Sequence, residues 1–258
     1  MEVWYMNGAG NDFMVMDARG KTLDFSQMAL ELCKLTGADG FMAVDVSDIA
    51  DFKLHFYNAD GSRGEMCGNG SRCICRFAYE HGIAGENMVV QTDAGLVYGT
   101  RLSESQYRVK LNNPGVVDLN RKPGIAYLEL GNPGVPHAVM EVPGLRWEQA
   151  EELKEMARSL RYDPAFPKGA NVNLYGWLDE ITVRILTFER GVEDYTLACG
   201  TGSASTAVTL WLQNKIPEDT LTLENRGGNL TVTISGKDGV VETLLLEGPT
   251  EVVRTYEI

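Results

Sequence analysis

Two short segments of the 258-residue chain carry the same arrangement of a cysteine followed by glycines. They are Met66-Cys67-Gly68-Asn69-Gly70-Ser71 and Ala198-Cys199-Gly200-Thr201-Gly202-Ser203. The two cysteines are 199 − 67 = 132 positions apart, about half of the chain, so their spacing predicts an internal duplication. Two thiols that flank one carbon can invert its configuration, because one removes a proton while the other supplies a proton to the opposite face.

Each Gly-x-Gly-Ser turn opens an apolar, helix-like run, which places each cysteine at a helix N-terminus. The first N–H groups of a helix have no partner within the helix and carry partial positive charge, so they bind anions. A cysteine at this place ionises more readily than a free cysteine. The same N–H groups can hold a substrate carboxylate and the charge that spreads onto it as the α-proton leaves. Each segment therefore predicts a base together with a site for an oxyanion.

The pattern around each cysteine predicts an α+β fold made of two similar lobes. In each half the order is strand, polar loop, cysteine and helix, and most strands are expected to pair with neighbours in the sequence. We therefore expect, in each lobe, a mostly antiparallel or mixed β-sheet wrapped around the helix that begins at the cysteine. The first lobe is placed at 1–114 and the second at 115–248, and the strand at 249–258 is expected to return to the first lobe.

The individual elements follow from hydrophobic periodicity and turn residues. The stretch between Arg190 and Tyr195 is expected to be a loop. Helices are predicted near 25–36, 67–81, 147–159 and 199–213. Strands are predicted near 2–6, 12–17, 41–46, 51–57, 87–92, 96–101, 106–112, 125–130, 137–142, 171–176, 181–188, 220–223, 229–234, 240–246 and 251–257.

The composition narrows the class of function. With 44% apolar and 23% charged residues, the chain is typical of a globular protein. Its net charge of −13 argues against binding to nucleic acid or to an anionic membrane surface. The N-terminus lacks a basic region followed by an apolar core, and no run approaches the ~18 apolar residues of a membrane span. We expect a cytoplasmic protein with neither nucleic acid nor membrane as a partner.

The five cysteines do not suggest a disulfide framework, because their number is odd and no secretion signal is seen. Cys67, Cys73 and Cys75 lie close in sequence, but their spacing is not a zinc pattern, so no metal site is predicted. Cys33 falls in an apolar helical pattern and is expected in the core. Nothing singles out a Schiff-base lysine, so no pyridoxal phosphate and no other cofactor is expected.

Five further segments, taken in order with the two cysteine motifs, resemble the diaminopimelate epimerase family. The set runs nearly from end to end of the chain, and is specific where a single Gly-x-Gly would be weak. The resemblance implies a cofactor-independent enzyme that epimerises LL-diaminopimelate to meso-diaminopimelate, a precursor of lysine and peptidoglycan. The segments are Gly8-Ala9-Gly10-Asn11-Asp12-Phe13, Gly37-Ala38-Asp39-Gly40, Asn58-Ala59-Asp60-Gly61-Ser62, Ala170-Asn171-Val172-Asn173 and Glu189-Arg190-Gly191.

The same resemblance implies roles for individual residues. The catalytic residues would be the acid–base pair Cys67 and Cys199, His137 beside the reacting centre, and Glu189, which would act near a thiol or accept from the distal ammonium. The reacting carboxylate would be received by the backbone N–H groups of Gly68, Asn69, Gly200 and Thr201. The far, non-reacting end of the substrate would be held by Asn11, Asn58, Asn171, Glu189 and Arg190. A planar guanidinium suits a carboxylate, and asparagines offer both donors and acceptors to a zwitterion.

Two departures from the family pattern leave the substrate open. Val135 stands where the family commonly has asparagine, and Asn132, just upstream, is the other candidate for that role. Tyr195 stands near the second cysteine, where the family usually has glutamate. A racemase of another amino acid, such as histidine, is therefore the main alternative to diaminopimelate. A deuterium-exchange screen of amino acids would separate the two.

Other functions fit the residues less well. A proline-racemase-like enzyme is disfavoured because that family usually carries histidine at the position of Asn69. Phosphate-binding turns are disfavoured because no lysine follows either glycine loop as in a Walker motif. A non-catalytic amino-acid-binding protein is disfavoured by the paired cysteines. The sequence leaves the oligomeric state open, with a homodimer among the alternatives.

Overall fold

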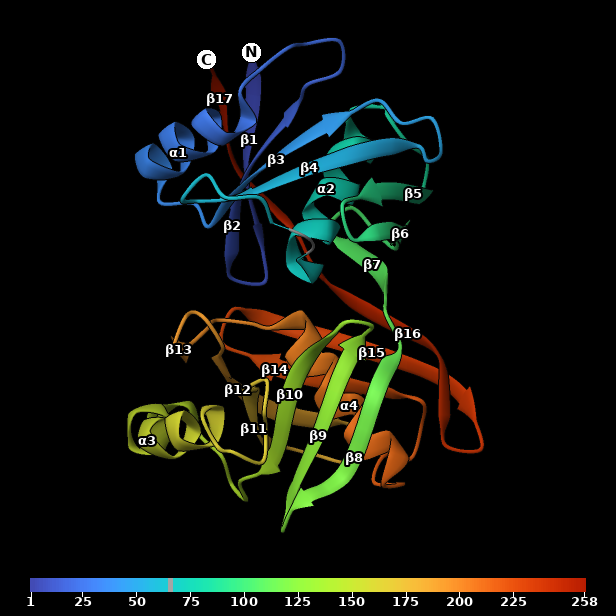
Figure 1. The fold of residues 1–258 in the computed structure, drawn as a ribbon. Helices are drawn as coiled ribbons and strands as arrows, with labels where there is room; N and C mark the ends of the chain where they lie inside the picture. The colour runs from blue at the N-terminus through green and yellow to red at the C-terminus, as the bar shows by residue number, and fades with distance from the viewer. Residues whose placement is uncertain (65–66) are drawn as a thin grey trace. The chain divides into compact units, whose positions relative to one another are not determined.

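The structure is a computed structural model that describes residues 1–64 and 67–258, so Met66 of the first cysteine motif lies outside the described residues. The chain divides into two compact units, one of Met1–Lys110 with Glu247–Ile258 and one of Leu111–Leu246. Each unit contains a β-sheet, a central helix against the sheet, and a second helix (Figure 1). Most strands and all four long helices lie close to their predicted positions.

The first unit wraps its sheet around α2. Its strands pair in the order β17-β1-β2-β3-β4-β5-β6-β7, with parallel pairing at β2–β3 and β4–β5 and antiparallel pairing elsewhere. Helix α2 packs against β1, β2, β3 and β6, while α1 packs against β2, β3 and β4. The elements are β1 (Glu2–Gly8), β2 (Asn11–Asp17), α1 (Phe25–Thr36), β3 (Gly40–Asp45), β4 (Phe52–Asn58), α2 (Gly68–Glu80), β5 (Asn87–Thr92), β6 (Gly95–Arg101), β7 (Gln106–Leu111) and β17 (Glu251–Glu257).

The second unit repeats this plan around α4. Its strands pair in the order β8-β9-β10-β11-β12-β14-β15, again with two parallel pairs, β10–β11 and β12–β14. Helix α4 packs against β9, β10, β11, β14 and β15, while α3 packs against β11 and β12. The elements are β8 (Pro114–Lys122), β9 (Ile125–Gly131), β10 (Gly134–Glu141), the 3-10 helix η1 (Trp147–Gln149), α3 (Ala150–Arg161), β11 (Asn171–Trp177), β12 (Thr182–Glu189), β13 (Asp194–Tyr195), α4 (Gly200–Leu212), β14 (Thr220–Asn225), β15 (Gly228–Lys237) and β16 (Val240–Pro249).

The two units share one topology. Strands β2-β3-β4-β5 pair as parallel, antiparallel and parallel, and strands β10-β11-β12-β14 do the same. In each unit the central helix is the next helix after the antiparallel pair, as α2 follows β4 and α4 follows β12. The predicted fold class is therefore confirmed: an α+β fold of two similar halves, each with a mixed sheet around a cysteine-led helix.

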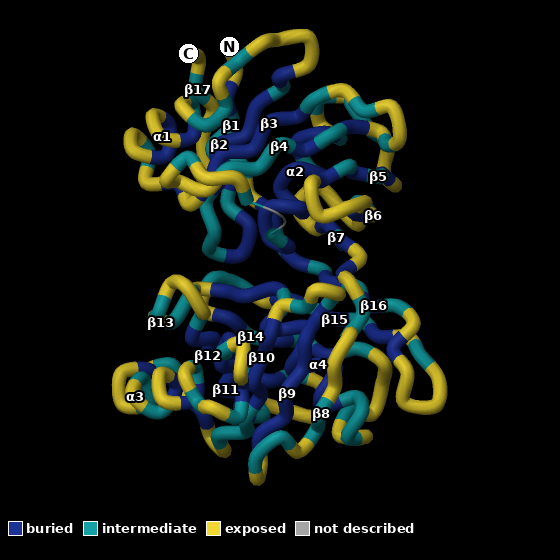
Figure 2. Tube along the Cα trace, in the orientation of Figure 1, coloured by how far each residue is buried: buried dark blue, intermediate teal, exposed yellow. Residues whose placement is uncertain are grey.

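Burial explains the unusual sequence of the central helices. Small and hydroxyl residues make up most of α4, and its positions 202–210 are buried. Figure 2 shows α2 and α4 in dark blue along much of their length, whereas α1 and α3 alternate between buried and exposed. A helix covered on several faces cannot expose a polar stripe, so its hydroxyls bond within the helix. Thr206 and Thr209 donate to the carbonyls of Gly202 and Ser205 at 2.9 and 2.8 Å.

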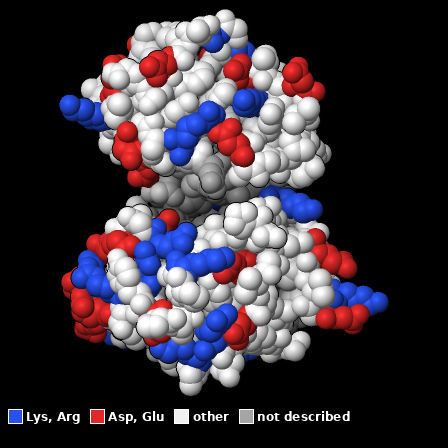
Figure 3. Space-filling model, viewed as in Figure 1, with Lys and Arg blue, Asp and Glu red and all other residues white. Residues whose placement is uncertain are grey.

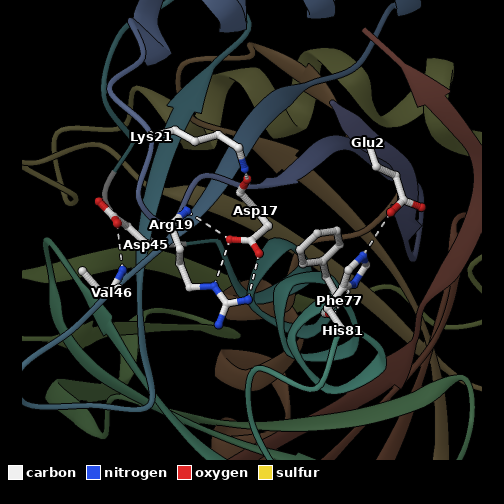
Figure 4. A network of polar contacts seen from close by, with 8 residues as sticks. All are labelled: Glu2, Asp17, Arg19, Lys21, Asp45, Val46, Phe77 and His81. Atoms are coloured by element: carbon white, nitrogen blue, oxygen red, sulfur yellow. Dashed lines mark hydrogen bonds and ion pairs between the residues drawn. The ribbon is translucent and has the colours of Figure 1, made fainter.

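Polar contacts hold the ends of elements in the first unit (Figure 4). At the end of β2, Arg19 donates through Nε and Nη2 to the carboxylate of Asp17 at 3.0 and 2.8 Å, which lowers the pKa of Asp17. At the end of α2, the His81 ring stacks on Phe77 with centroids 3.9 Å apart, and its Nε2 lies 3.6 Å from Glu2. Charged side chains of both signs intermingle on the face drawn in Figure 3.

Two strands differ from the sequence-based expectation. Strand β8 was not predicted, since Pro114, Gly115 and the charged residues that follow break any alternation. It pairs with β9 with two register irregularities, and Val116 and Val117 are exposed, as is common for irregular strands near a sheet edge. The short β13 lies within the stretch expected as a loop and pairs with the end of β12. Among the described residues, no helix is both long and apolar enough to cross a bilayer.

Gly8 sets how closely α2 approaches β1. A Cβ at this position would lie 2.8 Å from the carbonyl oxygen of Asn69 and 2.9 Å from Sγ of Cys73. We expect Gly8→Ala to push α2 away and to lower the free energy of unfolding by about 1–3 kcal/mol, the usual cost of overpacking a core. Urea and thermal unfolding measure this loss. Gly85→Ala is the matched control, because nothing lies within 4 Å of its Cβ; equal losses in both variants would contradict the tight packing.

Candidate active site

Cys67 and Cys199 occupy the same place in their units, as the N-cap residues of α2 and α4. Their backbone angles are nearly the same, with φ and ψ of −125° and 123° at Cys67 and −124° and 112° at Cys199. Hydrogen bonding within each helix begins in the same way, with Ser71 N–H donating to the Cys67 carbonyl at 2.7 Å and Ser203 N–H to the Cys199 carbonyl at 2.9 Å. Each cysteine therefore leads its helix, as the repeated motif predicts.

The helix start also determines what surrounds each sulfur. Cys199 is 8% exposed, and its Sγ accepts from the N–H of Gly202 at 3.4 Å and lies 3.6 Å from Oγ1 of Thr201. Hydrogen-bond donors directed at sulfur favour the charged thiolate. Cys67 is partly exposed. The predicted oxyanion residues Gly68, Asn69, Gly200 and Thr201 form the first turns of the two helices, before the helices' own hydrogen-bond ladders begin.

In the first unit, three predicted substrate-binding residues lie at the ends of elements: Asn11 begins β2, Asn58 ends β4, and Asn69 is in the first turn of α2. The Asn69 side chain donates to Oδ1 of Asn11 at 2.7 Å, and Asn11 donates to Asp39 at 3.2 Å. Asn58, the last residue of β4, pairs in register with Gly40, directly after Asp39. Asn58 is exposed and its amide donates to Oγ of Ser62 at 3.0 Å. Polar groups from β2, β4 and α2 thus gather beside the first cysteine motif.

In the second unit, the predicted residues also lie near the ends of strands. His137 of β10 pairs in register with Asn171 of β11, and β12 ends at Glu189. The Asn171 side chain donates to the Pro136 carbonyl at 3.0 Å and accepts from the backbone N–H of Arg190 at 2.8 Å. Asn171 therefore positions the start of the loop that presents Arg190. The Arg190 side chain is exposed, and its Nη1 donates to the carbonyl of Lys168 at 3.0 Å.

His137 is neutral in the folded protein. Its side chain is completely buried, and burial, with a smaller effect of the Arg190 charge, lowers its pKa to about 3. Asn173 Nδ2 lies 3.2 Å from His137 Nδ1. Because an amide nitrogen only donates, this contact places the imidazole proton on Nε2. Nε2 has no hydrogen-bond partner among the residues that the structure describes. His137 can therefore offer a neutral N–H donor, but not an imidazolium ion.

Asn173 is a site residue to which the sequence analysis gave no role. Its Oδ1 accepts from Thr187 Oγ1 at 3.0 Å, and its Nδ2 also donates to the Ala138 carbonyl at 3.0 Å. The first turn of α4 rests on this pair, since a Cβ at Gly202 would overlap Asn173 Oδ1 and lie 3.0 Å from Thr187 Oγ1. Asn173 lies two residues after Asn171 on one strand, so both side chains are on the same face of the sheet. This spacing was the signal in the sequence that Asn173 could belong to the site.

The other three cysteines are not candidates for catalysis. Cys33, Cys73 and Cys75 are buried, which confirms the expectation for Cys33. Burial raises the pKa of Cys33 to about 11 and those of Cys73 and Cys75 to about 12. Thiols with such pKa values are inert at neutral pH, because the thiolate is the reactive form. No group of three or more metal-ligating side chains is found in the described part of the chain.

The sequence is similar to that of known diaminopimelate epimerases. A family model described as Diaminopimelate epimerase matches residues 3–115 and 130–251. The diaminopimelate epimerase of Aquifex aeolicus (strain VF5) is 35% identical over 268 residues, which cover 95% of this chain and 93% of the relative. The diaminopimelate epimerase of Caldanaerobacter subterraneus subsp. tengcongensis is 37% identical over 227 residues, which cover 79% of this chain and 81% of the relative.

Solved structures share the fold at low sequence identity. A phenazine biosynthesis protein of the PhzF family from Bacillus anthracis matches with a TM-score of 0.74 and 13% identity, over 100% of this chain and 98% of its own. A hydroxyproline epimerase from Agrobacterium vitis matches with a TM-score of 0.68 and 16% identity, over 100% of this chain and 90% of its own. The fold is therefore the duplicated α+β fold of this structural class. Within that class, the chain belongs to the diaminopimelate epimerase family.

The buried neutral His137 makes stability depend on pH. Unfolded histidine has a pKa of about 6.5, whereas that of His137 in the fold is about 3. Between these values the unfolded chain binds one more proton, so the free energy of unfolding falls as pH falls through this window. We expect wild type to lose about 2 kcal/mol more than His137→Gln between pH 7 and pH 5. Urea unfolding of both proteins at both pH values tests this, since other groups cancel in the difference. Parallel losses would contradict the neutral His137.

Proposed function

We propose that this protein is an isomerase that epimerises LL-diaminopimelate to meso-diaminopimelate, with Cys67 and Cys199 as its acid–base pair. One observation carries the proposal: a member of the diaminopimelate epimerase family places a cysteine at the N-cap of each of two equivalent helices. The substrate is a small amino acid. We also propose a cytoplasmic location, which the buried thiols Cys33, Cys73 and Cys75 support, because reducing compartments keep such thiols reduced.

The reaction exchanges one proton for another at a single carbon. A thiolate removes the α-proton, so that the Cα–H bond breaks and an S–H bond forms. The second thiol then gives its proton to the opposite face of the carbon and becomes the thiolate. The charge of the intermediate spreads onto the α-carboxylate, which the first N–H groups of the helices stabilise. After one turnover thiol and thiolate have exchanged places, so the two directions start from different protonation states.

We assign the far amino-acid group of the substrate to five polar residues that the family resemblance also indicates. They are Asn11 and Asn58 of the first unit, and Asn171, Glu189 and Arg190 of the second. The Arg190 guanidinium has five donors, and one of its nitrogens bonds to Lys168, so the remaining donors can hold a carboxylate. Glu189 can accept from the distal ammonium. Binding of this far end positions the reacting carbon, so the binding energy raises the rate of the chemical step.

Turnover of LL-diaminopimelate with uptake of deuterium from heavy water is the direct test of this function. We expect Cys67→Ala and Cys199→Ala each to lower the rate of inversion by about two to four orders of magnitude, because each variant lacks either the base or the acid. Cys33→Ala is the matched control, since it removes a buried thiol from α1.

Each outcome has a defined meaning. A rate of inversion close to that of wild type in either alanine variant would contradict the two-thiol mechanism. Histidine is assayed beside diaminopimelate, and faster turnover of histidine would overturn the substrate assignment and leave the thiol chemistry in place. Absence of exchange with every amino acid tried would favour a non-catalytic binding protein.

Arg190→Ala tests the recognition of the distal carboxylate. Loss of a charged hydrogen bond costs about 1.5–3 kcal/mol, so we expect kcat/KM for diaminopimelate to fall by about 10- to 100-fold. Arg158→Ala, on the exposed side of α3, is the matched control and should leave kcat/KM unchanged. Steady-state assays of both variants, with circular dichroism to check the fold, give the comparison. An unchanged kcat/KM in Arg190→Ala would remove Arg190 from the substrate site.

A further inference from the structure

A fully buried arginine lies on the first turns of α2, five residues after Cys67. The side chain of Arg72 is 0% exposed. Its Nη2 donates to Oδ1 of Asn69 at 2.9 Å, and its Nη1 lies 3.4 Å from the carbonyl oxygen of Gly68. Both acceptors are neutral, and Nε has no partner among the described residues. A buried charge is costly unless an opposite charge compensates it, so this guanidinium calls for a nearby anion.

Among the described residues, the groups whose charge acts on Arg72 are three thiols. Burial lowers the pKa of Arg72, whereas the thiols Cys73, Cys67 and Cys75, when ionised, raise it. Such an interaction acts equally on both partners, so a charged Arg72 favours each thiolate. Cys73 and Cys75 nevertheless stay protonated, because burial raises their pKa values to about 12. Cys67, partly exposed at the helix start, is the thiol whose ionisation Arg72 can promote.

Other charged groups around this turn have partners of their own. Asp12 of β2 accepts from Tyr5 of β1 at 2.9 Å and from Asn7 at 2.7 Å. Asp39, directly before β3, accepts from the side chain of Asn11 and the N–H of Asp12. Arg76, one turn further along α2, pairs with Glu80 at 2.7 Å. Strand β6 contributes Gly99, which packs against Cys75, since an added Cβ would overlap its Sγ.

The second unit has no counterpart to this charge. Five residues after Cys199 stands Ala204, which is buried, and α4 contains neither lysine nor arginine. The two cysteines have nearly the same backbone geometry, since φ is −125° at Cys67 and −124° at Cys199, and ψ is 123° and 112°. The helix start acts on both thiols, but the cap hydrogen bond that Sγ of Cys199 accepts from Gly202 is not repeated at Cys67. The two thiols also differ in burial, since Cys199 is buried whereas Cys67 is partly exposed, and the buried guanidinium bonds to the turn that follows Cys67.

Arg72 also ends a chain of hydrogen bonds that sets the first turn of α2. Because Arg72 occupies Oδ1 of Asn69, the amide nitrogen of Asn69 is directed at Asn11, 2.7 Å away. Asn11 in turn donates to Asp39 at 3.2 Å. Arg72 thus fixes an amide in the turn that carries the proposed oxyanion donors.

We propose that Arg72 is a positioning residue that favours the thiolate of Cys67, so that the resting protein carries its thiolate on Cys67 and its thiol on Cys199. This assignment deepens the proposed function and rests on it for its catalytic meaning. It concerns the ionisation of two thiols, which can be measured without substrate. The proposal and the proposed function can therefore fail separately.

The test is the pH dependence of alkylation by iodoacetamide, followed at each cysteine by peptide mass spectrometry. In wild type we expect the midpoint for Cys67 to lie at least about one pH unit below that for Cys199. Arg72→Met should raise the midpoint of Cys67 by about one unit or more and shift that of Cys199 by less. Arg72→Lys retains the charge and should restore most of the shift. Arg76→Met is the matched control, since it removes a neighbouring arginine that is paired with Glu80.

Equal midpoints for Cys67 and Cys199 in wild type, or an unchanged Cys67 midpoint in Arg72→Met, would overturn the proposal. If Arg72→Met does not fold, Arg72→Lys and the comparison of the two thiols in wild type still decide. A shifted midpoint without turnover of diaminopimelate would keep the role of Arg72 and reject the proposed function. Turnover of diaminopimelate with an unshifted Cys67 midpoint in Arg72→Met would reject the role of Arg72 and keep the proposed function.

Discussion

The close contact between the first turn of each central helix and its sheet is the constraint on which the candidate site depends. In the first unit Gly8 of β1 leaves room for Asn69 and Cys73, and in the second unit Gly202 of α4 leaves room for Asn173. The glycine stands on the strand in one case and on the helix in the other. Both solutions bring helix backbone against strand side chains or backbone, and so fix the N-cap cysteine and the N–H groups that follow it.

This contact forces polar groups into the interior, and their hydrogen bonds then orient the site. Beneath α4, Asn173 joins His137, Ala138 and Thr187. The Asn173 amide nitrogen can only donate, so the His137 nitrogen that it contacts must accept, and the imidazole proton lies on Nε2. Burial removes the alternative of an imidazolium. The first unit has no such histidine, since Phe13 holds the corresponding place, paired with the first residue of the next parallel strand.

Much of the fold could be predicted from local patterns, because strands, polar loops and helix starts each leave a mark in the sequence. The two cysteine motifs predicted where α2 and α4 begin. Strand β8 could not be predicted, since an irregular strand with exposed valines lacks the alternation that burial on one face imposes. Arg72 was overlooked for a related reason. A charged residue in a helix suggests a solvated face, and only the sheet that wraps α2 makes that position an interior one.

A duplicated fold faces a particular difficulty when its two halves must hold a base and an acid at the same time. Nearly equal backbone geometry places both Cys67 and Cys199 at a helix N-terminus, where partial positive charge favours either thiolate. The difference has to come from side chains that the duplication did not preserve. Arg72 corresponds to Ala204 in the repeat, and both positions are buried, so one half holds a full positive charge where the other holds a methyl group. An unequal interior within an equal backbone is a physical means by which two copies of one motif acquire opposite protonation states.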